Sequence, residues 1–192
     1  MNCPYTFLMG PDVILQPPIP NKNKLKDPPF LKVYTKNTVE QFIKRYILSS
    51  IKAQILVLVS PFISTLDGEL YCLKDVLNKA QKDHTRVYVV TRKPEAEYQL
   101  SGVELLKQFS CVEIRYNPEV HAKLYICWGR ELEESFAFFG SGNLTSGGLR
   151  YNVELGMMIL ARGEGKYILK KLYQWGGFDI RTVSTLIKPI SK

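Results

Sequence analysis

A histidine and a lysine stand two residues apart in the run His121-Ala122-Lys123, which leads into an apolar segment typical of a β-strand. Side chains two apart on a strand point to the same face of a sheet. An imidazole can act as a nucleophile, and an ammonium group can stabilise developing negative charge. Such a pair could act on an anionic group, but a strand end whose His and Lys reach water gives the same pattern, so the pair alone predicts little.

A glycine-rich turn follows the next apolar segment, in the run Gly140-Ser141-Gly142-Asn143. Two glycines around a serine let a backbone approach a ligand closely. The hydroxyl and amide groups of Ser141 and Asn143 are neutral donors that could bind phosphate oxygens. An ordinary β-turn has the same composition, so this run also needs support from elsewhere.

A carboxylate supplies the third element, since Glu154 lies within the apolar run 153–160. A carboxylate in such surroundings needs a partner. An imidazole is a suitable partner, because a carboxylate can fix its tautomer and raise its basicity. We therefore expect Glu154 to orient His121.

The elements that must position these residues alternate between the helical and the strand period. We expect strands at 53–59, 86–91, 111–116, 121–128, 135–139 and 153–161, and helices at about 39–51, 67–80, 95–109 and 164–175. Strands alternating with helices over short links predict an α/β fold with a mixed, mostly parallel β-sheet flanked by helices, in one domain.

The set His121-x-Lys123, Gly140-Ser141-Gly142-Asn143 and Glu154 resembles the His-Lys motif of the phospholipase D-like superfamily, in its single-motif nuclease branch. The resemblance covers about residues 38–175. It implies the phospholipase D-like fold, and His121, Lys123, Asn143 and Glu154 as catalytic residues. It also implies a substrate-binding part for Ser141 and Gly142, and for Ser60, because the run Val59-Ser60-Pro61-Phe62 resembles the end of the family's first strand, which borders the site.

Two features depart from the family pattern. The family usually has an aspartate five residues after the lysine, and Trp128 stands there. Full-length members carry two His-Lys motifs, whereas this chain has one. His84 is followed by Arg86 and not by a lysine and a glycine-serine turn, so we interpret it as a surface residue before a strand.

The family chemistry needs two histidines, one that attacks phosphorus and one that protonates the leaving oxygen. A chain with one motif can supply both only through two-fold pairing. The resemblance therefore implies a homodimer with a composite site in which His121 of each subunit takes part. It implies no metal or other cofactor, because the lysine pair supplies the charge that Mg²⁺ supplies in other phosphoryl-transfer enzymes.

Composition favours a polyanionic partner. The net charge of +8 is compatible with nucleic acid or an acidic membrane surface, and also with no such partner. No segment is long and apolar enough for stable membrane insertion, and no secretory signal opens the chain, so we expect a cytoplasmic protein. The four cysteines lack the spacing of a zinc site.

The chain divides into three parts in this prediction. Residues 1–36 hold seven of the eleven prolines and form an arm packed on the body, with Lys22, Lys24 and Lys26 as a basic cluster. Residues 37–177 form the catalytic domain, and residues 178–192 form a tail that could lead to a recognition domain. The function that the resemblance implies is a metal-independent endonuclease that cleaves DNA or RNA through a covalent phosphohistidine. The chain could be the catalytic part of a restriction-type nuclease. A phospholipase or other small-phosphodiester hydrolase, and a nucleic-acid-binding module with an inactive site, remain as alternatives.

Overall fold

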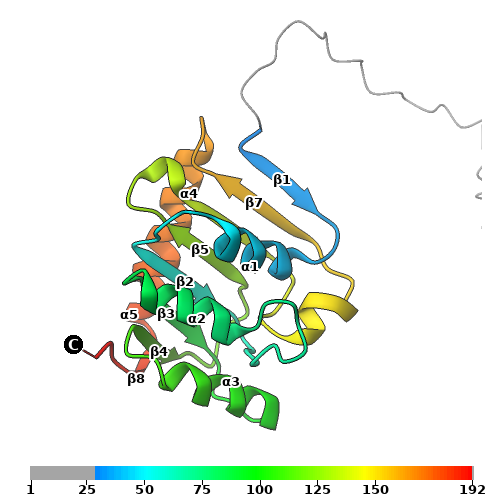
Figure 1. Ribbon diagram of the computed structural model, residues 1–192, viewed down its shortest axis with the longest axis vertical. Helices are drawn as coiled ribbons and strands as arrows, with labels where there is room; N and C mark the ends of the chain where they lie inside the picture. Colours follow the sequence, from blue (N-terminus) through cyan, green and yellow to red (C-terminus); the bar gives the residue numbers. More distant parts are fainter. Residues whose placement is uncertain (1–28, 192) are drawn as a thin grey trace, which may run out of the picture.

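The computed structural model describes residues 29–191. The proline-rich arm expected over 1–36 lies mostly outside the described residues, as does the cluster Lys22, Lys24 and Lys26. The described part is built on one eight-stranded sheet with the strand order β1-β7-β6-β5-β2-β3-β4-β8 (Figure 1). Its strands are β1 (Leu31–Tyr34), β2 (Ile55–Val59), β3 (Arg86–Thr91), β4 (Val112–Tyr116), β5 (Leu124–Trp128), β6 (Phe136–Gly140), β7 (Gly156–Leu160) and β8 (Thr185–Lys188).

The mixed α/β sheet predicted from the sequence is confirmed, but it is mostly antiparallel. Only the pairs β2–β3 and β3–β4 are parallel. The other five pairs are antiparallel. Parallel neighbours need a crossover connection, usually a helix. Among strands that pair with the next strand of the chain, only β2–β3 and β3–β4 have an α-helix between them. The chain from β5 to β7 forms consecutive antiparallel pairs, and the two edge strands add two more.

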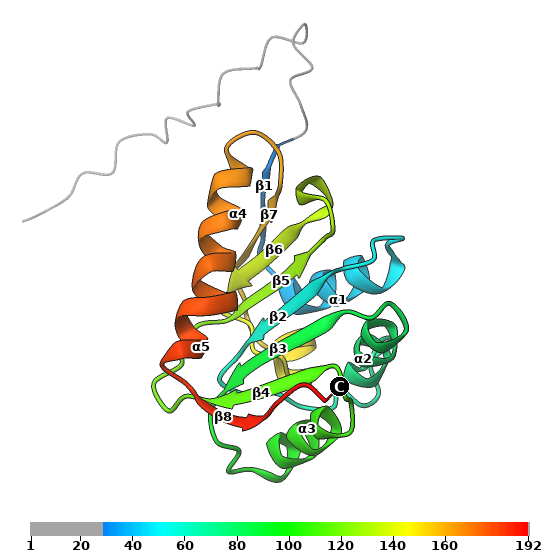
Figure 2. The ribbon, with the colours of Figure 1, turned by 90° about the vertical axis from the view of Figure 1, so that its left-hand side faces the viewer.

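Helices cover both faces of this sheet (Figure 2). One face packs against α1 (Thr38–Leu48), α2 (Leu73–Lys82) and α3 (Glu97–Lys107). The other packs against α4 (Gly165–Gln174), the π-helical turn η3 (Trp175–Asp179) and α5 (Ile180–Thr182). Because β5 lies between two cores, Tyr125 and Cys127 are buried with the first helices, and Leu124 and Ile126 with the second.

Both edge strands come from segments that the sequence assigned outside the catalytic domain. β1 lies in the expected arm and pairs with β7, as Leu31 opposite Ile159 shows. β8 lies in the expected tail and pairs with β4. Residues 31–34 and 185–188 therefore belong to the same sheet as the rest of the domain.

One helix begins later than the sequence predicted. We expected Asp67 to open the second helix, but α2 begins at Leu73, where Asp75 accepts a hydrogen bond from the Cys72 backbone (2.9 Å). Asp67 instead accepts from the Thr65 hydroxyl (2.6 Å) in the preceding loop. A carboxylate three residues into the helix satisfies the exposed backbone donors of its first turn, which Asp67 could not reach.

Eight strand ends meet at one end of the sheet, which we call the site end. β1, β2, β3, β4 and β6 finish there, and β5, β7 and β8 begin there. In open α/β sheets the carboxyl ends of parallel strands border the usual binding crevice. Every residue that the sequence marked for chemistry lies in a segment that starts or ends a strand at this end.

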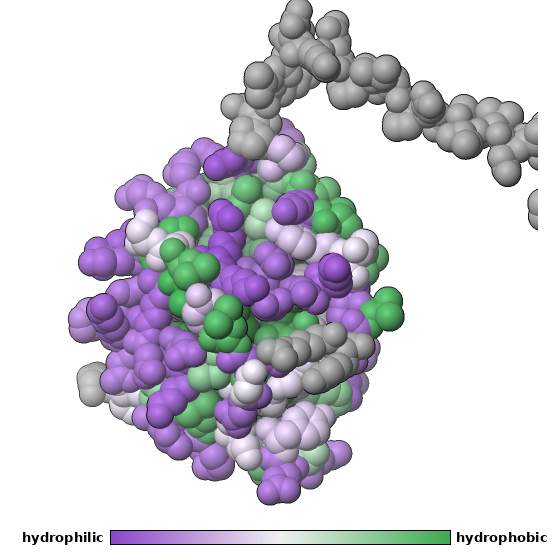
Figure 3. Space-filling view, turned by 45° about the vertical axis from the view of Figure 1, so that its right-hand side comes forward, coloured by the Kyte–Doolittle hydropathy of each residue, from purple (hydrophilic) through white to green (hydrophobic). Residues whose placement is uncertain are grey.

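The surface of the described part is mixed in polarity. Figure 3 shows hydrophobic residues in several separate patches between hydrophilic ones on the face turned toward the viewer. Among residues 29–191, no helix combines the length and the apolar character that crossing a membrane would require.

Candidate functional site

His121 and Lys123 lie in an extended segment that leads into β5. The strand begins at Leu124, opposite Val59 of β2 and Phe139 of β6, and not at His121 as the sequence predicted. The pairing of β5 with the neighbouring strands β2 and β6 ends at Leu124, so residues 121–123 have no strand partners. One hydrogen bond still joins this segment to β6, from the Gly140 N–H to the Lys123 carbonyl (3.2 Å). Strand alternation therefore does not by itself place the two side chains on one face.

The side chains of this segment differ in their surroundings. His121 is exposed and lines a pocket of about 420 Å³ whose apolar walls include Val120, Trp175 and Ile180. Lys123 is half-buried, and its ammonium group donates to the His121 carbonyl (2.9 Å). The Lys123 side chain thus fixes the backbone that carries His121.

The turn after β6 holds Glu154 in place. The Ser141 hydroxyl donates to the Glu154 carboxylate and accepts from the Leu155 N–H (3.0 Å). Its only proton is therefore used within the protein. Gly140 must be small here, since a Cβ would collide with the Leu155 carbonyl and lie 2.6 Å from the Cα of Gly156. The two strands that carry the turn and the carboxylate thus approach each other closely.

Glu154 is buried, with 5% of its surface exposed, and its charge is felt by Lys123. Burial lowers the pKa of the Lys123 ammonium, the Glu154 carboxylate opposes this effect, and Arg92 adds to it; the net result is a lowered pKa. The buried carboxylate and the half-buried ammonium compensate each other, so neither charge is left unpaired in the protein. Such an arrangement suits a site that binds an anion.

A buried polar framework supports the turn from below. The Tyr125 hydroxyl donates to the Gly142 carbonyl (2.7 Å), and burial raises the pKa of Tyr125 well above its ordinary value. Ser60 is fully buried, donates to the Phe62 carbonyl (2.7 Å) and accepts from the Leu144 N–H (3.0 Å). Ser60 has no surface to offer a substrate, and its contacts tie the end of β2 to the segment after Asn143.

Asn143 follows this framework and is half-buried. Its side-chain Oδ1 is buried and has no hydrogen-bond partner among the described residues. An unpaired buried amide group is unusual and costs about 1–3 kcal/mol. The side-chain oxygen of Asn143 is thus a buried acceptor at the site end that no described residue pairs.

The structure brings Lys123, Ser141, Gly142 and Glu154 together. A Cβ on Gly142 would lie 3.6 Å from the Glu154 carboxyl carbon, so the turn closes directly over the carboxylate. His121 joins this group through its backbone carbonyl. Within the described contacts, Glu154 bonds to Ser141, and no hydrogen bond links it to the His121 side chain. The expected orienting contact between Glu154 and His121 thus stays a prediction.

Sequence reasoning missed Arg92, which follows β3 at the site end. Its Nε donates to the carbonyl of Val120 (2.8 Å), the residue before His121. The sequence held one signal for Arg92: it is a cation that directly follows a buried strand of the parallel part of the sheet. The carboxyl end of such a strand borders the usual binding crevice. No motif accompanies Arg92, which is why the residue pattern did not mark it.

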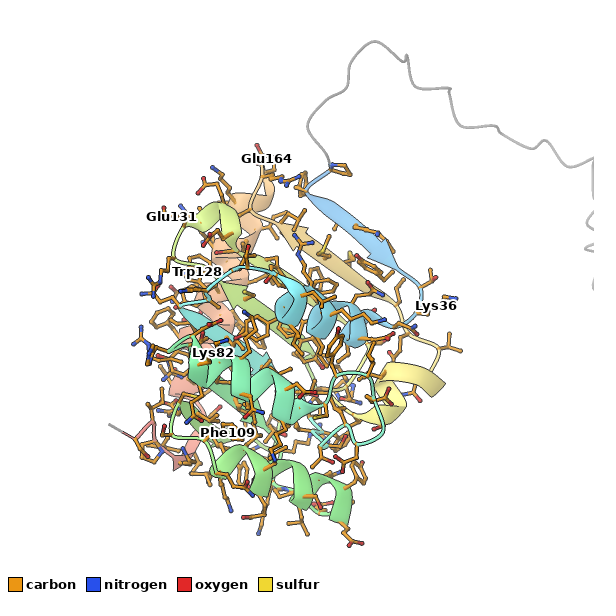
Figure 4. All side chains as sticks on the ribbon, viewed as in Figure 1. Lys36, Lys82, Phe109, Trp128, Glu131 and Glu164 are labelled. Atoms are coloured by element: carbon orange, nitrogen blue, oxygen red, sulfur yellow. The ribbon has the colours of Figure 1, made fainter. Side chains whose placement is uncertain are left out.

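Trp128 and His84 lie at the opposite end of the sheet. Trp128 ends β5 and stacks on Tyr173 with 4.0 Å between ring centroids, so the residue at the family's aspartate position packs against α4. Figure 4 shows Trp128 and Lys82 on one side of the molecule and Lys36, which follows β1, on the other. His84 is exposed and precedes β3, as the sequence predicted. It lies far along the strand from His121.

Within residues 29–191, no three His, Cys, Asp or Glu side chains gather in a way that could hold a metal ion. The charged groups that act on the Lys123 ammonium are instead one cation, Arg92, and one carboxylate, Glu154. This donor set suits an anionic ligand better than a divalent cation.

Comparison with known proteins supports the fold strongly and the sequence relation weakly. No family model matches the sequence, and a search of curated proteins finds no match. Among solved structures, Nuc from Salmonella typhimurium, a phospholipase D family member, matches with a TM-score of 0.57 and 14% identity over 83% of this chain and 99% of that one. NucT from Helicobacter pylori matches with a TM-score of 0.60 and 11% identity, over 82% and 98%.

Larger proteins contain the same fold. TrmBL2, an archaeal chromatin protein with a novel mode of DNA binding, matches with a TM-score of 0.50 and 14% identity over 86% of this chain and 57% of that one. Phosphatidylserine synthase from Haemophilus influenzae matches with a TM-score of 0.52 and 16% identity, over 87% and 42%. The predicted phospholipase D-like fold is thereby confirmed.

Proposed function

We propose that this chain, which has the phospholipase D-like fold, is a metal-independent phosphodiesterase that cleaves DNA or RNA through a covalent phosphohistidine at His121. One observation carries the proposal: Lys123, the Gly140–Asn143 turn and buried Glu154 converge at the start of β5, beside the backbone of His121. Each motif alone has an ordinary structural explanation. Their convergence at the site end does not follow from those explanations.

The reaction we propose has two steps and needs two imidazoles. In the first, His121 attacks phosphorus, the bond to the leaving oxygen breaks, and His121 of the partner subunit donates its proton to that oxygen. In the second, water attacks phosphorus and gives its proton back to that second imidazole, and the phosphorus–nitrogen bond breaks. Two identical groups can act as nucleophile and as acid when their protonation states differ at the start.

The other residues stabilise charge and geometry in this proposal. Lys123 neutralises the oxygens that gain charge in the transition state. The side-chain N–H group of Asn143 donates a hydrogen bond to one of the same oxygens. Ser141 and Gly142 position Glu154, and Glu154 compensates the charge of Lys123 and orients His121. Ser60 supports the turn from within the core.

Nucleic acid is the substrate class that we favour. The net charge of +8 suits a polyanion. The likeness to TrmBL2, described as a DNA-binding chromatin protein, supports the same choice. We further propose a homodimer, because the described part of each chain places only His121 at the site end while the chemistry needs two imidazoles.

The proposal is tested by hydrolysis of labelled DNA and RNA in the presence of EDTA. Wild-type protein should cleave at least one of them, and His121→Ala should lower the rate by about 10³-fold or more, because nucleophile loss removes the covalent route. His84→Ala is the matched control and should cleave at the wild-type rate. Cleavage that requires added Mg²⁺, or that His121→Ala leaves intact, would refute the proposal.

A phospholipid or other small phosphodiester is the second candidate substrate. The pocket that His121 lines has apolar walls, and the likeness to a phosphatidylserine synthase is of similar strength. Hydrolysis of phosphatidylcholine vesicles faster than of any nucleic acid would favour it. A nucleic-acid-binding module without activity is the third reading, and binding that persists in His121→Ala with no cleavage by wild type would favour that one.

The chain could also act as the catalytic part of a restriction-type nuclease. The tail that we expected to lead toward a recognition domain contains β8, an edge strand of the catalytic sheet. Any recognition part would therefore attach beyond this strand or elsewhere on the fold. Cleavage at defined sequences in a plasmid digest would support this version of the proposal.

A further inference from the structure

Arg92 is held at the site end by its backbone. It directly follows β3, the parallel strand between β2 and β4, and its N–H donates to the Pro61 carbonyl (3.3 Å). The hydroxyl of Thr91 donates to the same carbonyl (3.1 Å). The end of β3 is thereby fixed to the loop that follows β2, so the start of the Arg92 side chain has a defined position.

Its side chain is fixed as well. The Nε–H donates to the Val120 carbonyl (2.8 Å), and the guanidinium carbon lies 5.9 Å from the centroid of the Phe62 ring. Arg92 is half-buried between these groups. A guanidinium held by a carbonyl and by an aromatic ring loses little further freedom when it binds a ligand.

The rest of the guanidinium remains available. Arginine has five N–H donors, and the described contacts use only the one on Nε. No ion pair within residues 29–191 joins Arg92 to a carboxylate. The two terminal nitrogens therefore form a free fork, which matches the geometry of a phosphate group.

The surrounding charge also favours a second anion. Burial is the main cause that lowers the pKa of Lys123, and the charge of Arg92 lowers it further. Two cations thus lie near one buried carboxylate, Glu154. One substrate phosphate at Lys123 and a neighbouring phosphate at Arg92 would neutralise both cations.

We propose that Arg92 binds the phosphate next to the one that is cleaved, so that the site selects chains of consecutive phosphodiesters over isolated ones. The proposal rests on the proposed function and names the substrate feature that this same site recognises. Arg92 also contacts the Val120 carbonyl beside His121. The choice of substrate separates phosphate binding from an effect on the position of His121, since only the latter would lower activity on every substrate.

The test compares two substrates in EDTA: a short oligonucleotide, and bis(p-nitrophenyl) phosphate, which has no second phosphate. Arg92→Ala should lower kcat/KM for the oligonucleotide by roughly 10- to 100-fold, mainly through KM, because a charge-assisted contact is lost. The change for bis(p-nitrophenyl) phosphate should stay within about threefold. Arg92→Lys keeps the charge without the fork and should fall between. Exposed Lys82, at the opposite end of the sheet, gives the control Lys82→Ala.

An equal loss on both substrates would overturn the proposal and leave Arg92 as a residue that only positions His121. No loss on either would overturn it too. Binding tests it without catalysis: anisotropy of a labelled oligonucleotide should show roughly 10- to 100-fold weaker binding to His121→Ala/Arg92→Ala than to His121→Ala. Equal binding by those two variants would contradict the proposal. Failure of wild type to cleave either substrate would instead count against the proposed function.

Discussion

The residues at the site end differ in how far the sequence could reveal them. Lys123, Glu154 and the Gly140–Asn143 turn were marked by type and spacing, and the structure brings them together. Arg92 was not marked, because a single arginine after a strand carries no spacing information. Its relation to His121 depends on the parallel pairing of β2 and β3, which only the folded chain provides.

Ser60 shows the reverse case at the same scale. A serine at the end of a strand that borders the site could contact a substrate, and the sequence suggested that it does. The structure instead buries it and uses its hydroxyl to join two loops. Burial depends on the loops that close over a residue, which are distant in sequence, so residue type alone could not predict it.

Lys123 gives a prediction on the pH dependence of activity. Only its protonated form stabilises the transition state, and burial lowers its pKa below the ordinary value. Activity should therefore be lost on the alkaline side as pH rises through this lowered pKa, earlier than for an exposed lysine. The profile of log kcat/KM against pH for wild type should show this limb.

Lys123→Arg provides the control for that profile. An arginine stays protonated throughout the measurable range, so the alkaline limb should disappear or move upward by about a unit or more in the residual activity. An unchanged alkaline limb in Lys123→Arg would show that another group titrates.

At the scale of elements, strands buried on both faces were predicted best. The strand at 86–91 has the predicted bounds, since its continuous apolar run is typical of such a strand. The short edge strand β8 was missed, because four residues with three exposed side chains carry no clear period. The expected start of β5 at His121 was wrong, since pairing ends where the neighbouring strands end.

A network around Arg181 holds the second helical layer to the sheet. Arg181 of α5 bonds to both oxygens of Glu113 on β4 (2.8 and 2.9 Å) and stacks on Tyr88 of β3, 3.7 Å from the ring centroid. Burial alone would raise the pKa of Glu113, but hydrogen bonds from Arg115 and Arg181 outweigh it and lower the pKa. The paired carboxylate thus stabilises the folded state above the ordinary pKa of a glutamate.

We expect Arg181→Ala to lower the free energy of unfolding by about 1–3 kcal/mol at neutral pH, measured by urea denaturation. The deficit should shrink as pH falls below the ordinary pKa of a glutamate and through the lowered pKa of Glu113, where wild type loses the same interaction. Exposed Arg162 provides the control, because its replacement by alanine should change stability by less than about 0.5 kcal/mol. A deficit that is constant with pH would contradict the role of the ion pair.

At the scale of the whole molecule, the layers follow from the sequence and the strand directions do not. The alternation of periods predicted a sheet between helices, which the two cores confirm. The direction of each strand depends on which neighbour it finds, and the later strands have no crossover helices to make them parallel. Likewise, the sequence could predict a need for two subunits but not the surface that joins them.

Pairing of subunits gives a prediction at this scale. Light scattering should give a mass of twice 22.0 kDa for the protein in solution. Adding an excess of His121→Ala subunits should lower the activity per wild-type subunit. A mixed dimer has one imidazole that could act as nucleophile but lacks the second one that acts as acid. A monomer with full activity, or activity that excess mutant leaves unchanged, would rule out the composite site.

The covalent role of His121 is tested most directly by the stereochemistry at phosphorus. A phosphorothioate diester of known configuration is hydrolysed in ¹⁸O-labelled water in EDTA, and the configuration of the product is determined. Two successive in-line displacements, first by His121 and then by water, predict retention of configuration. Inversion would mean that water attacks the substrate directly, and it would contradict a phosphohistidine on this chain.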